Sequence, residues 1–298
     1  MRALALLTVA AMTAACAVPK SPANASEPEP NDHSSCDARQ AESRGIVAER
    51  GAPVQTASAI RAAESSLPPP ALALGEASSN PATAPVVSIV APARDAHVDS
   101  DASVTLDVRA WPTAEGAAHV HLILDNQPYK PIYDTAAPVP LRDLNGGRDL
   151  APGPHVLVAF ASRANHESVK VPSAISVASF VVGTEPARFA SPEGFLVYSR
   201  PKGSYAGPQA NHVLVDFQLV GTSLAEGGRA VVLEVRGDAL LAPLRARTSR
   251  FGAPFYLENL RSGTYTIELA LVDGADKLVD GTWNKTTRTI TIDRAKKP

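Results

Sequence analysis

Short apolar runs with alternating polar positions fill the chain from about residue 86 onwards. They are rich in Val, Leu and Ile, and clusters of Pro, Gly, Asn and Asp separate them. Alternation with a period of two puts apolar side chains on one face of a strand, and the separating residues favour turns. The pattern therefore predicts β-strands throughout this region and is typical of an all-β sandwich.

The predicted strands fall into two successive sets of seven, each in about 100 residues. The first set consists of VVSIVAP (86–92), SVTLDVRAW (103–111), HVHLILD (119–125), YKPIYD (129–134), VPLRDL (139–144), HVLVAFAS (155–162) and ISVASFVV (175–182). The second consists of GFLVYS (194–199), HVLVDFQLV (212–220), AVVLEVRG (230–237), LLAPLRA (240–246), PFYLENL (254–260), YTIELALV (265–272) and TRTITID (287–293). We predict an all-β fold with two tandem seven-stranded sandwiches, over residues 86–184 and 190–293, and a short tail over 294–298.

The two sets align with each other as an internal duplication. VTLDV at 104–108 aligns with VLVDF at 213–217, and LAPGPHVLVAFAS at 150–162 aligns with LRSGTYTIELALV at 260–272. The alignment matches Asp107 with Asp216, Leu150 with Leu260, Gly153 with Gly263 and His155 with Tyr265.

The last of these pairs carries a family resemblance. LRSGTY resembles the tyrosine corner of immunoglobulin-like and fibronectin type III-like sandwiches, and LAPGPH resembles its bacterial variant with His in place of Tyr. The resemblance implies an Ig-like fold for both sets and a structural role for Tyr265 and His155. It does not specify a function, because such sandwiches host many unrelated activities.

The N-terminus, MRALALLTVAAMTAAC, has one Arg, an apolar run and small residues before Cys16. The apolar run is shorter than the roughly 20 residues of a spanning helix and has the layout of an export signal. It resembles a bacterial lipoprotein signal, which implies removal of residues 1–15 and lipid modification of Cys16. The alternative is ordinary signal-peptidase cleavage near Ala15.

Residues 16–85 are rich in Ala, Pro, Ser and Glu and include SEPEPND and SSLPPPALAL. Such a segment buries too little apolar surface to offset its ordering entropy, so we predict a disordered tether. The lipoprotein resemblance implies a membrane partner, through the lipid anchor on Cys16, in the bacterial cell envelope. In bacterial lipoproteins an Asp after the cysteine is associated with retention in the inner membrane. Because Ala17 stands there, the resemblance implies the outer membrane, at its periplasmic side or at the cell surface.

Composition narrows the function classes. The chain of 298 residues has 45% hydrophobic and 19% charged residues and a formal net charge of −2, so it lacks the basic field that nucleic-acid binding requires. Its two cysteines, Cys16 and Cys36, both precede the sandwiches, which therefore contain no disulfide and no cysteine nucleophile. No GxSxG motif and no phosphate-binding loop are present. We predict no cofactor and no enzymatic activity.

HVHLILD, at residues 119–125, contains the clearest candidate for a functional site. In a strand, His119 and His121 share one face with Ile123. The duplication matches Ile123 with Glu234, so we expect this face to point outward and the histidines to contact solvent or a partner. The string AAHVHL resembles the copper ligands of Cu,Zn superoxide dismutase, and this resemblance implies a zinc or copper site at His119 and His121. Zinc normally needs three or four ligands, of which the strand supplies two.

Two further motifs contain candidate functional residues. NHESVK at 165–170 has Lys170 where the HExxH metalloprotease motif has its second His, and it falls in a predicted loop, so we expect no converging ligands there. Trp283, in the turn DGTWNK, is a candidate ligand-binding aromatic residue, with coverage of the sandwich core as the alternative.

The sequence thus predicts a non-catalytic envelope lipoprotein that presents Ig-like modules for binding, adhesion or structure to a protein or glycan partner. The alternative is a zinc- or copper-binding protein that uses His119 and His121. A hydrolase assembled from dispersed residues is a third hypothesis.

Overall fold

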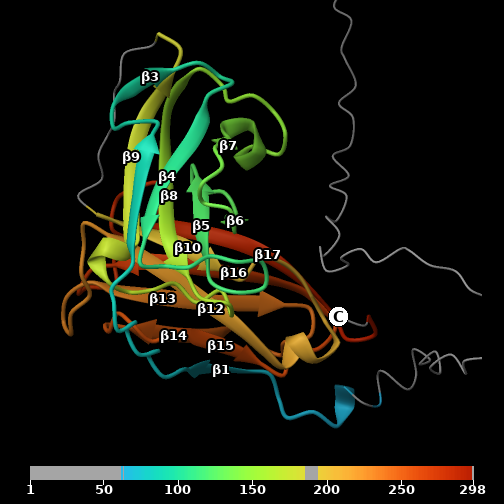
Figure 1. Ribbon diagram of the computed structural model, residues 1–298. Helices are drawn as coiled ribbons and strands as arrows, with labels where there is room; N and C mark the ends of the chain where they lie inside the picture. The colour runs from blue at the N-terminus through green and yellow to red at the C-terminus, as the bar shows by residue number, and fades with distance from the viewer. Residues whose placement is uncertain (1–61, 63, 185–193, 297–298) are drawn as a thin grey trace, which may run out of the picture. The chain divides into compact units, whose positions relative to one another are not determined.

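The computed structural model describes residue 62, residues 64–184 and residues 194–296 (Figure 1). These residues form β-strands and three short 3-10 helices, η1 (Leu141–Leu144), η2 (Pro172–Ala174) and η3 (Gly207–Asn211). The all-β prediction is confirmed. In the described ranges no helix is long and apolar enough to cross a membrane. The predicted signal peptide, Cys16 and most of the predicted tether lie outside them.

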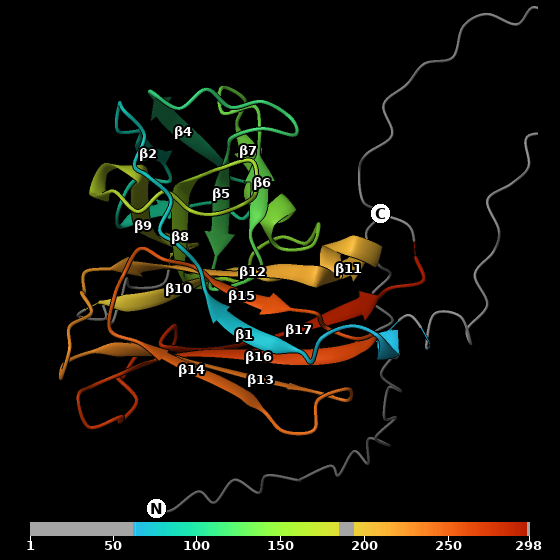
Figure 2. The same cartoon turned by 90° about the horizontal axis from the view of Figure 1, so that it is seen from below.

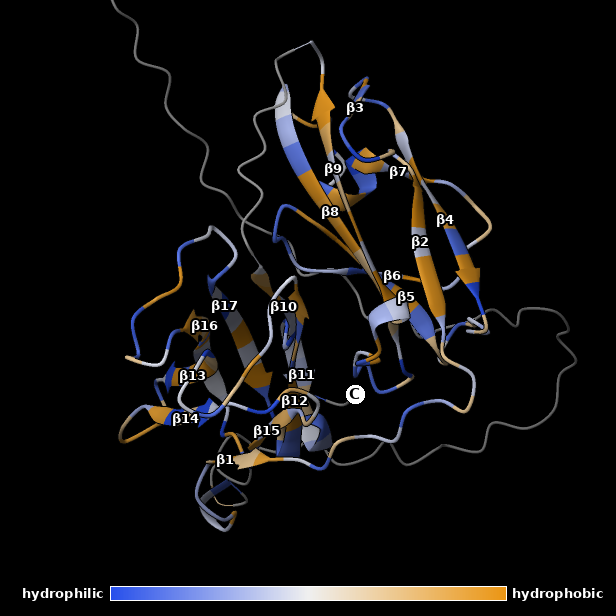
Figure 3. Cartoon of the chain, turned by 90° about the vertical axis from the view of Figure 1, so that its left-hand side faces the viewer, coloured by the Kyte–Doolittle hydropathy of each residue, from blue (hydrophilic) through white to orange (hydrophobic). Residues whose placement is uncertain are grey.

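The first sandwich packs a three-stranded sheet on a five-stranded sheet. The smaller sheet has the order β2-β4-β7, with β2 (Val86–Ala91), β4 (Ser103–Arg109) and β7 (Val139–Pro140). The larger has the order β3-β9-β8-β5-β6, with β3 (Ala96–Val98), β9 (Ile175–Val182), β8 (Gly153–Ser162), β5 (His119–Leu124) and β6 (Lys130–Ile132). Hydrophobic residues concentrate on strands such as β2 and β9 (Figure 3). Leu122, Leu157 and Phe180 are fully buried between the sheets.

The second sandwich packs a four-stranded sheet on a five-stranded sheet. The first has the order β1-β15-β12-β10, with β1 (Ala71–Leu74), β15 (Phe255–Glu258), β12 (His212–Val220) and β10 (Phe195–Arg200). The second has the order β11-β17-β16-β13-β14, with β11 (Gly203–Ala206), β17 (Lys285–Asp293), β16 (Gly263–Val272), β13 (Ala230–Gly237) and β14 (Leu244–Thr248). Its core is built on Leu233, Leu257 and Ile267.

Three short strands extend the predicted pattern. β3 pairs in parallel with β9, and β11 pairs in parallel with β17. With β1, the first sandwich has eight strands and the second has nine in the described ranges, where seven were expected in each. β1 pairs antiparallel with β15 in the second sandwich (Figure 2), although residues 71–74 were predicted to be disordered tether. Strands of three or four residues are too short for alternation to be visible, and their pairing depends on a sheet edge far away in sequence.

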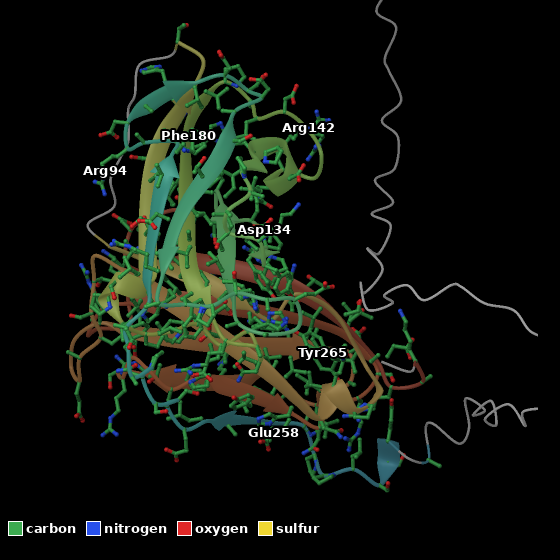
Figure 4. All side chains as sticks on the ribbon, viewed as in Figure 1. Arg94, Asp134, Arg142, Phe180, Glu258 and Tyr265 are labelled. Carbon is green, nitrogen blue, oxygen red and sulfur yellow. The ribbon has the colours of Figure 1, made fainter. Side chains whose placement is uncertain are left out.

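The duplicated corner is visible at the start of β8 and β16. Gly153 and Gly263 begin these strands with positive φ angles of +126° and +149°, which favour glycine. The Tyr265 hydroxyl donates to the Arg261 carbonyl at 2.9 Å (Tyr265 is labelled in Figure 4). His155 makes the matching contact, from Nε2 to the Ala151 carbonyl at 2.8 Å. In both sandwiches the corner residue ties the strand to the backbone four residues earlier.

His155 also makes a second bond that Tyr265 cannot make. Its Nδ1 lies 2.6 Å from Oδ2 of Asp125, whose Oδ1 accepts a bond from the Val156 amide. Both ring nitrogens therefore face acceptors, which suits the doubly protonated imidazolium. The hydrogen bond with Asp125 raises the pKa of His155 above its usual value.

A third apolar cluster joins the two sandwiches. Its fully or nearly fully buried members are Ile123, Tyr129, Val158 and Phe160 from the first sandwich and Phe195, Val197 and Trp283 from the second. An ion pair also joins the two sandwiches, with the partly buried Lys170 Nζ 2.6 Å from Oδ1 of the fully buried Asp216. The outer face of β5 and β8 is therefore an internal surface of the protein.

The bond between His155 and Asp125 predicts a pH-dependent stability. Because the pKa of His155 is raised in the folded state, its stabilisation is complete below about pH 6.5 and is lost as pH rises through the folded pKa. In Asp125→Asn, which keeps an acceptor for the Val156 amide, we expect this decrease above pH 6.5 to become smaller. Chemical denaturation from pH 6 to 9 measures it, and parallel pH profiles of the two proteins would contradict the assignment.

The cluster between the sandwiches predicts a large cost for Trp283→Ala. Trp283 is 6% exposed and packs on Phe195 with ring centroids 5.0 Å apart, so its truncation leaves a cavity at the junction. We expect the free energy of unfolding to fall by about 3 kcal/mol. The fully exposed Leu241 is the control, since Leu241→Ala is expected to change stability by less than about 0.5 kcal/mol. Equal effects in urea denaturation would show that the junction is not packed as described.

Candidate metal centre

His119 and His121 lie in β5, the fourth strand of the order β3-β9-β8-β5-β6. Val120, Leu122 and Leu124 point into the core of the first sandwich, and Ile123 belongs to the cluster between the sandwiches. The two histidines share the face of Ile123, as the alternation predicts.

This face does point away from the core of the first sandwich, as expected, but it does not contact solvent. His119 is 1% exposed and His121 is fully buried. The physical reason is the second sandwich, whose strand β10 supplies Phe195 and Val197 to cover the face. Two imidazoles that were expected to contact solvent or a partner are instead enclosed within the chain.

His166 joins them from the loop after β8. β5 pairs with β8 so that His119 lies opposite Ser162, the last residue of β8. A turn then forms, in which the His166 amide donates to the Arg163 carbonyl and the Arg163 amide donates to the Glu167 carbonyl, both at 2.9 Å. The φ angle of His166 is +66°, a left-handed value that few non-glycine residues adopt. This turn folds the imidazole back towards β5.

One nitrogen of each of the three imidazole rings lies within 3.4 Å of the corresponding nitrogens of the other two. His119 Nε2 lies 3.0 Å from His121 Nε2 and 2.9 Å from His166 Nδ1, and His121 Nε2 lies 3.4 Å from His166 Nδ1. NHESVK was expected to hold no converging ligands, because Lys170 stands where the HExxH motif has its second His. His166 of this motif instead lies against the two strand histidines.

Hydrogen bonds on the far side of the rings orient the cluster. His119 Nδ1 lies 2.9 Å from the Ala117 carbonyl, so this nitrogen carries the proton and Nε2 directs its lone pair inward. His121 Nδ1 lies 3.2 Å from the Ser199 hydroxyl at the end of β10. Bonds of this kind fix the tautomer and the ring orientation of metal-binding histidines in proteins.

The three imidazoles are neutral at physiological pH. Burial lowers the pKa of His119, lowers that of His121 well below its usual value, and lowers that of His166 to about 3. The positive charge of Arg200 depresses all three further. Neutral imidazole is the form that binds a metal, so no proton has to leave these rings before an ion binds.

Aromatic and basic side chains surround the cluster. The Tyr129 ring stacks on His121 with centroids 3.5 Å apart, and the Tyr133 ring lies 5.0 Å from that of His119. Arg200 donates to the hydroxyls of Tyr129 and Tyr205, both at 3.0 Å. No Asp, Glu or Cys in the described ranges joins the three histidines in this group.

The other predicted site residues lie elsewhere. Trp283 is buried in the cluster between the sandwiches, so the alternative in which it covers a core holds, and it offers no open platform for a ligand. His155 and Tyr265 occupy the two corners, and Cys16 lies outside the described residues.

Comparisons with known proteins do not indicate a function for this chain. No protein-family model matches the chain, and no curated protein matches it. Among solved structures, the fibronectin(III)-like modules of Clostridium thermocellum CbhA are 11% identical, with 70% of this chain and 95% of that chain covered at a TM-score of 0.24. The FN1-FN3 domains of chicken CNTN1 are 9% identical, with 70% and 65% covered at a TM-score of 0.20. Domains 4 and 5 of the S-layer protein SbsC are 9% identical, with 71% and 98% covered at 0.18. Similarity at this level carries no argument about function.

Proposed function

We propose that this protein binds a zinc or copper ion between His119, His121 and His166. The observation that carries the proposal is the convergence of three imidazole nitrogens, all within 4.8 Å of one another. Three histidines and one open position form an established type of zinc site, and imidazole also suits copper. The strand alone offers two ligands, and the loop after β8 supplies the third.

Hydrogen bonding alone accounts poorly for this cluster. Each of the three contacts is favourable only if one nitrogen carries a proton and the other a lone pair. Among three nitrogens that each hold one or the other, at most two of the three contacts can be of this kind. The third contact, between His121 Nε2 and His166 Nδ1 at 3.4 Å, then opposes two like groups in a buried site. A cation at the centre would accept all three lone pairs.

The proposed function is binding rather than catalysis. The cellular location that we propose is inferred from the sequence. After removal of the export signal over residues 1–15, a tether rich in proline over residues 16–85 would hold the two sandwiches away from a membrane. We place the protein in a bacterial cell envelope, anchored through lipid on Cys16 and facing the periplasm or the surface at the outer membrane. Two tandem Ig-like sandwiches on a tether also favour a second function, the presentation of a binding, adhesive or structural module to a protein or glycan.

Metal binding is tested with His166→Gly, which removes the ligand and suits the positive φ angle at this position. The wild type is expected to retain one zinc or copper ion per chain after dialysis. Loss of a supporting hydrogen bond around a metal typically costs 10–100-fold in affinity, so loss of a ligand is expected to cost at least about 100-fold. His97→Ala is the control, because His97 is exposed and lies in β3, outside the cluster. Elemental analysis that finds no metal in the wild type, or equal metal in His166→Gly, would rule out the site.

The anchor is tested by mass spectrometry of the mature N-terminus. We expect a chain that begins at Cys16 and carries lipid, and a Cys16→Ser variant that carries none. An unmodified N-terminus near Ala15 would replace the lipoprotein proposal with ordinary export, without affecting the metal site.

A further inference from the structure

Residues 64–79, called the strap below, run from the second sandwich to the turn that carries His166. Near the start of the strap, Arg261 Nη2 donates to the Leu67 carbonyl at 2.8 Å. The middle of the strap is β1, which pairs with β15 as an edge strand (Figure 2). The strap ends beside the loop after β8, so it links the edge of the second sandwich to the candidate metal centre.

The end of the strap contacts both ends of the turn that carries His166. Ser78 Oγ donates to Glu167 Oε2 at 2.7 Å. Arg163 Nη2 donates to the Ser79 carbonyl at 2.6 Å. Arg163 and Glu167 are the two residues whose backbone hydrogen bond closes the turn, and His166 lies between them. Because Glu167 is 3% exposed, its bond with Ser78 has little competition from water, and the strap holds the turn at both ends.

A separate contact holds Ser168, which follows the turn. The Ser168 amide and hydroxyl donate to Asp216 Oδ2 at 3.1 and 2.7 Å. Asp216 is fully buried in β12, so this contact does not depend on the strap. Loss of the strap therefore loosens His166 without freeing the whole loop, and we expect metal affinity to decrease rather than to disappear.

The strap is held weakly compared with the strands that it contacts. β1 has four residues and, in the described ranges, pairs with β15 alone. Leu72 packs on the core of the second sandwich, while Leu74 is 56% exposed. Segments with few buried apolar contacts open at a lower free energy than the whole protein unfolds. Because the strap precedes β2–β17 in the chain, a pull on the tether from its N-terminal end acts on the strap first.

We propose that the strap controls the affinity of the metal centre. When it is docked on β15, it holds His166 in place for tight binding. When a pull on the tether detaches it, the third ligand moves and the ion is released. This inference rests on the proposed metal-binding function. Ser78, Arg163 and Glu167 are positioning residues, because they act on the ion through His166.

The test uses the full-length protein with Zn²⁺ alone as the probe. In Ser78→Ala, which removes the bond to Glu167, we expect zinc affinity to fall about 10-fold in competition with a chelator, as is typical when a supporting bond around a metal is lost. Ser79→Ala is the matched control, because Ser79 contacts Arg163 through its main-chain carbonyl, and it is expected to bind zinc as the wild type does. Ser78→Thr keeps the hydroxyl and is expected to restore binding. The midpoint of urea unfolding of zinc-free Ser78→Ala is expected to stay at the wild-type value, which separates positioning from general stability.

Hydrogen exchange supplies the reciprocal measurement. If a docked strap raises zinc affinity about 10-fold, zinc stabilises the docked strap by the same factor. The Gly75 amide in the strap donates to the Pro254 carbonyl at 2.8 Å. We therefore expect saturating zinc to slow its exchange by about 10-fold in the wild type. In His166→Gly, the same zinc concentration is expected to leave this exchange rate unchanged.

Equal zinc affinity in Ser78→Ala and the wild type, or a Gly75 exchange rate that zinc does not change, overturns the control by the strap and leaves the histidine site standing. A wild type that binds neither zinc nor copper overturns the proposed function itself.

Discussion

The burial of one face of β5 and β8 against β10 is the contact on which the proposed metal centre depends. β10 is buried on both faces: Leu196 and Tyr198 enter the core of the second sandwich, while Phe195 and Val197 pack on the first. The same strand delivers Ser199 to His121. A register shift between β10 and β12 at Tyr198 and Arg200 interrupts the alternation, as a β-bulge does, where Arg200 bonds to Tyr129.

The two copies of the duplicated unit have diverged at this contact. β13, the counterpart of β5, carries Val232 and Glu234 where β5 carries His121 and Ile123, and both are partly exposed. The first copy has its histidines on a face that the second copy covers, so their environment arises from the tandem arrangement rather than from one sandwich alone. In that enclosed site neutral imidazoles are strongly favoured, since burial and Arg200 both oppose their protonation.

Alternation in the sequence was sufficient to predict the longer strands and the shared face of His119 and His121, but not the short strands β1, β3 and β11. It was insufficient for their burial, because a strand pattern does not reveal which other sheet will cover its outer face. The apolar run in GFLVYS at 194–199 could have indicated this contact, since a strand without polar alternation is typically buried on both faces. His166 was missed because its approach depends on the β5–β8 register and on a positive φ angle in a loop, neither of which a periodic pattern encodes.

X-ray absorption spectroscopy of the protein loaded with one zinc ion is the most direct test of the site formed by His119, His121 and His166, because it reports the atoms bound to the metal. A three-histidine site predicts a four-coordinate ion with three imidazole nitrogens at about 2.0–2.1 Å and one oxygen ligand. An ion bound only by oxygen atoms, or a first shell without the scattering pattern of imidazole rings, would contradict it.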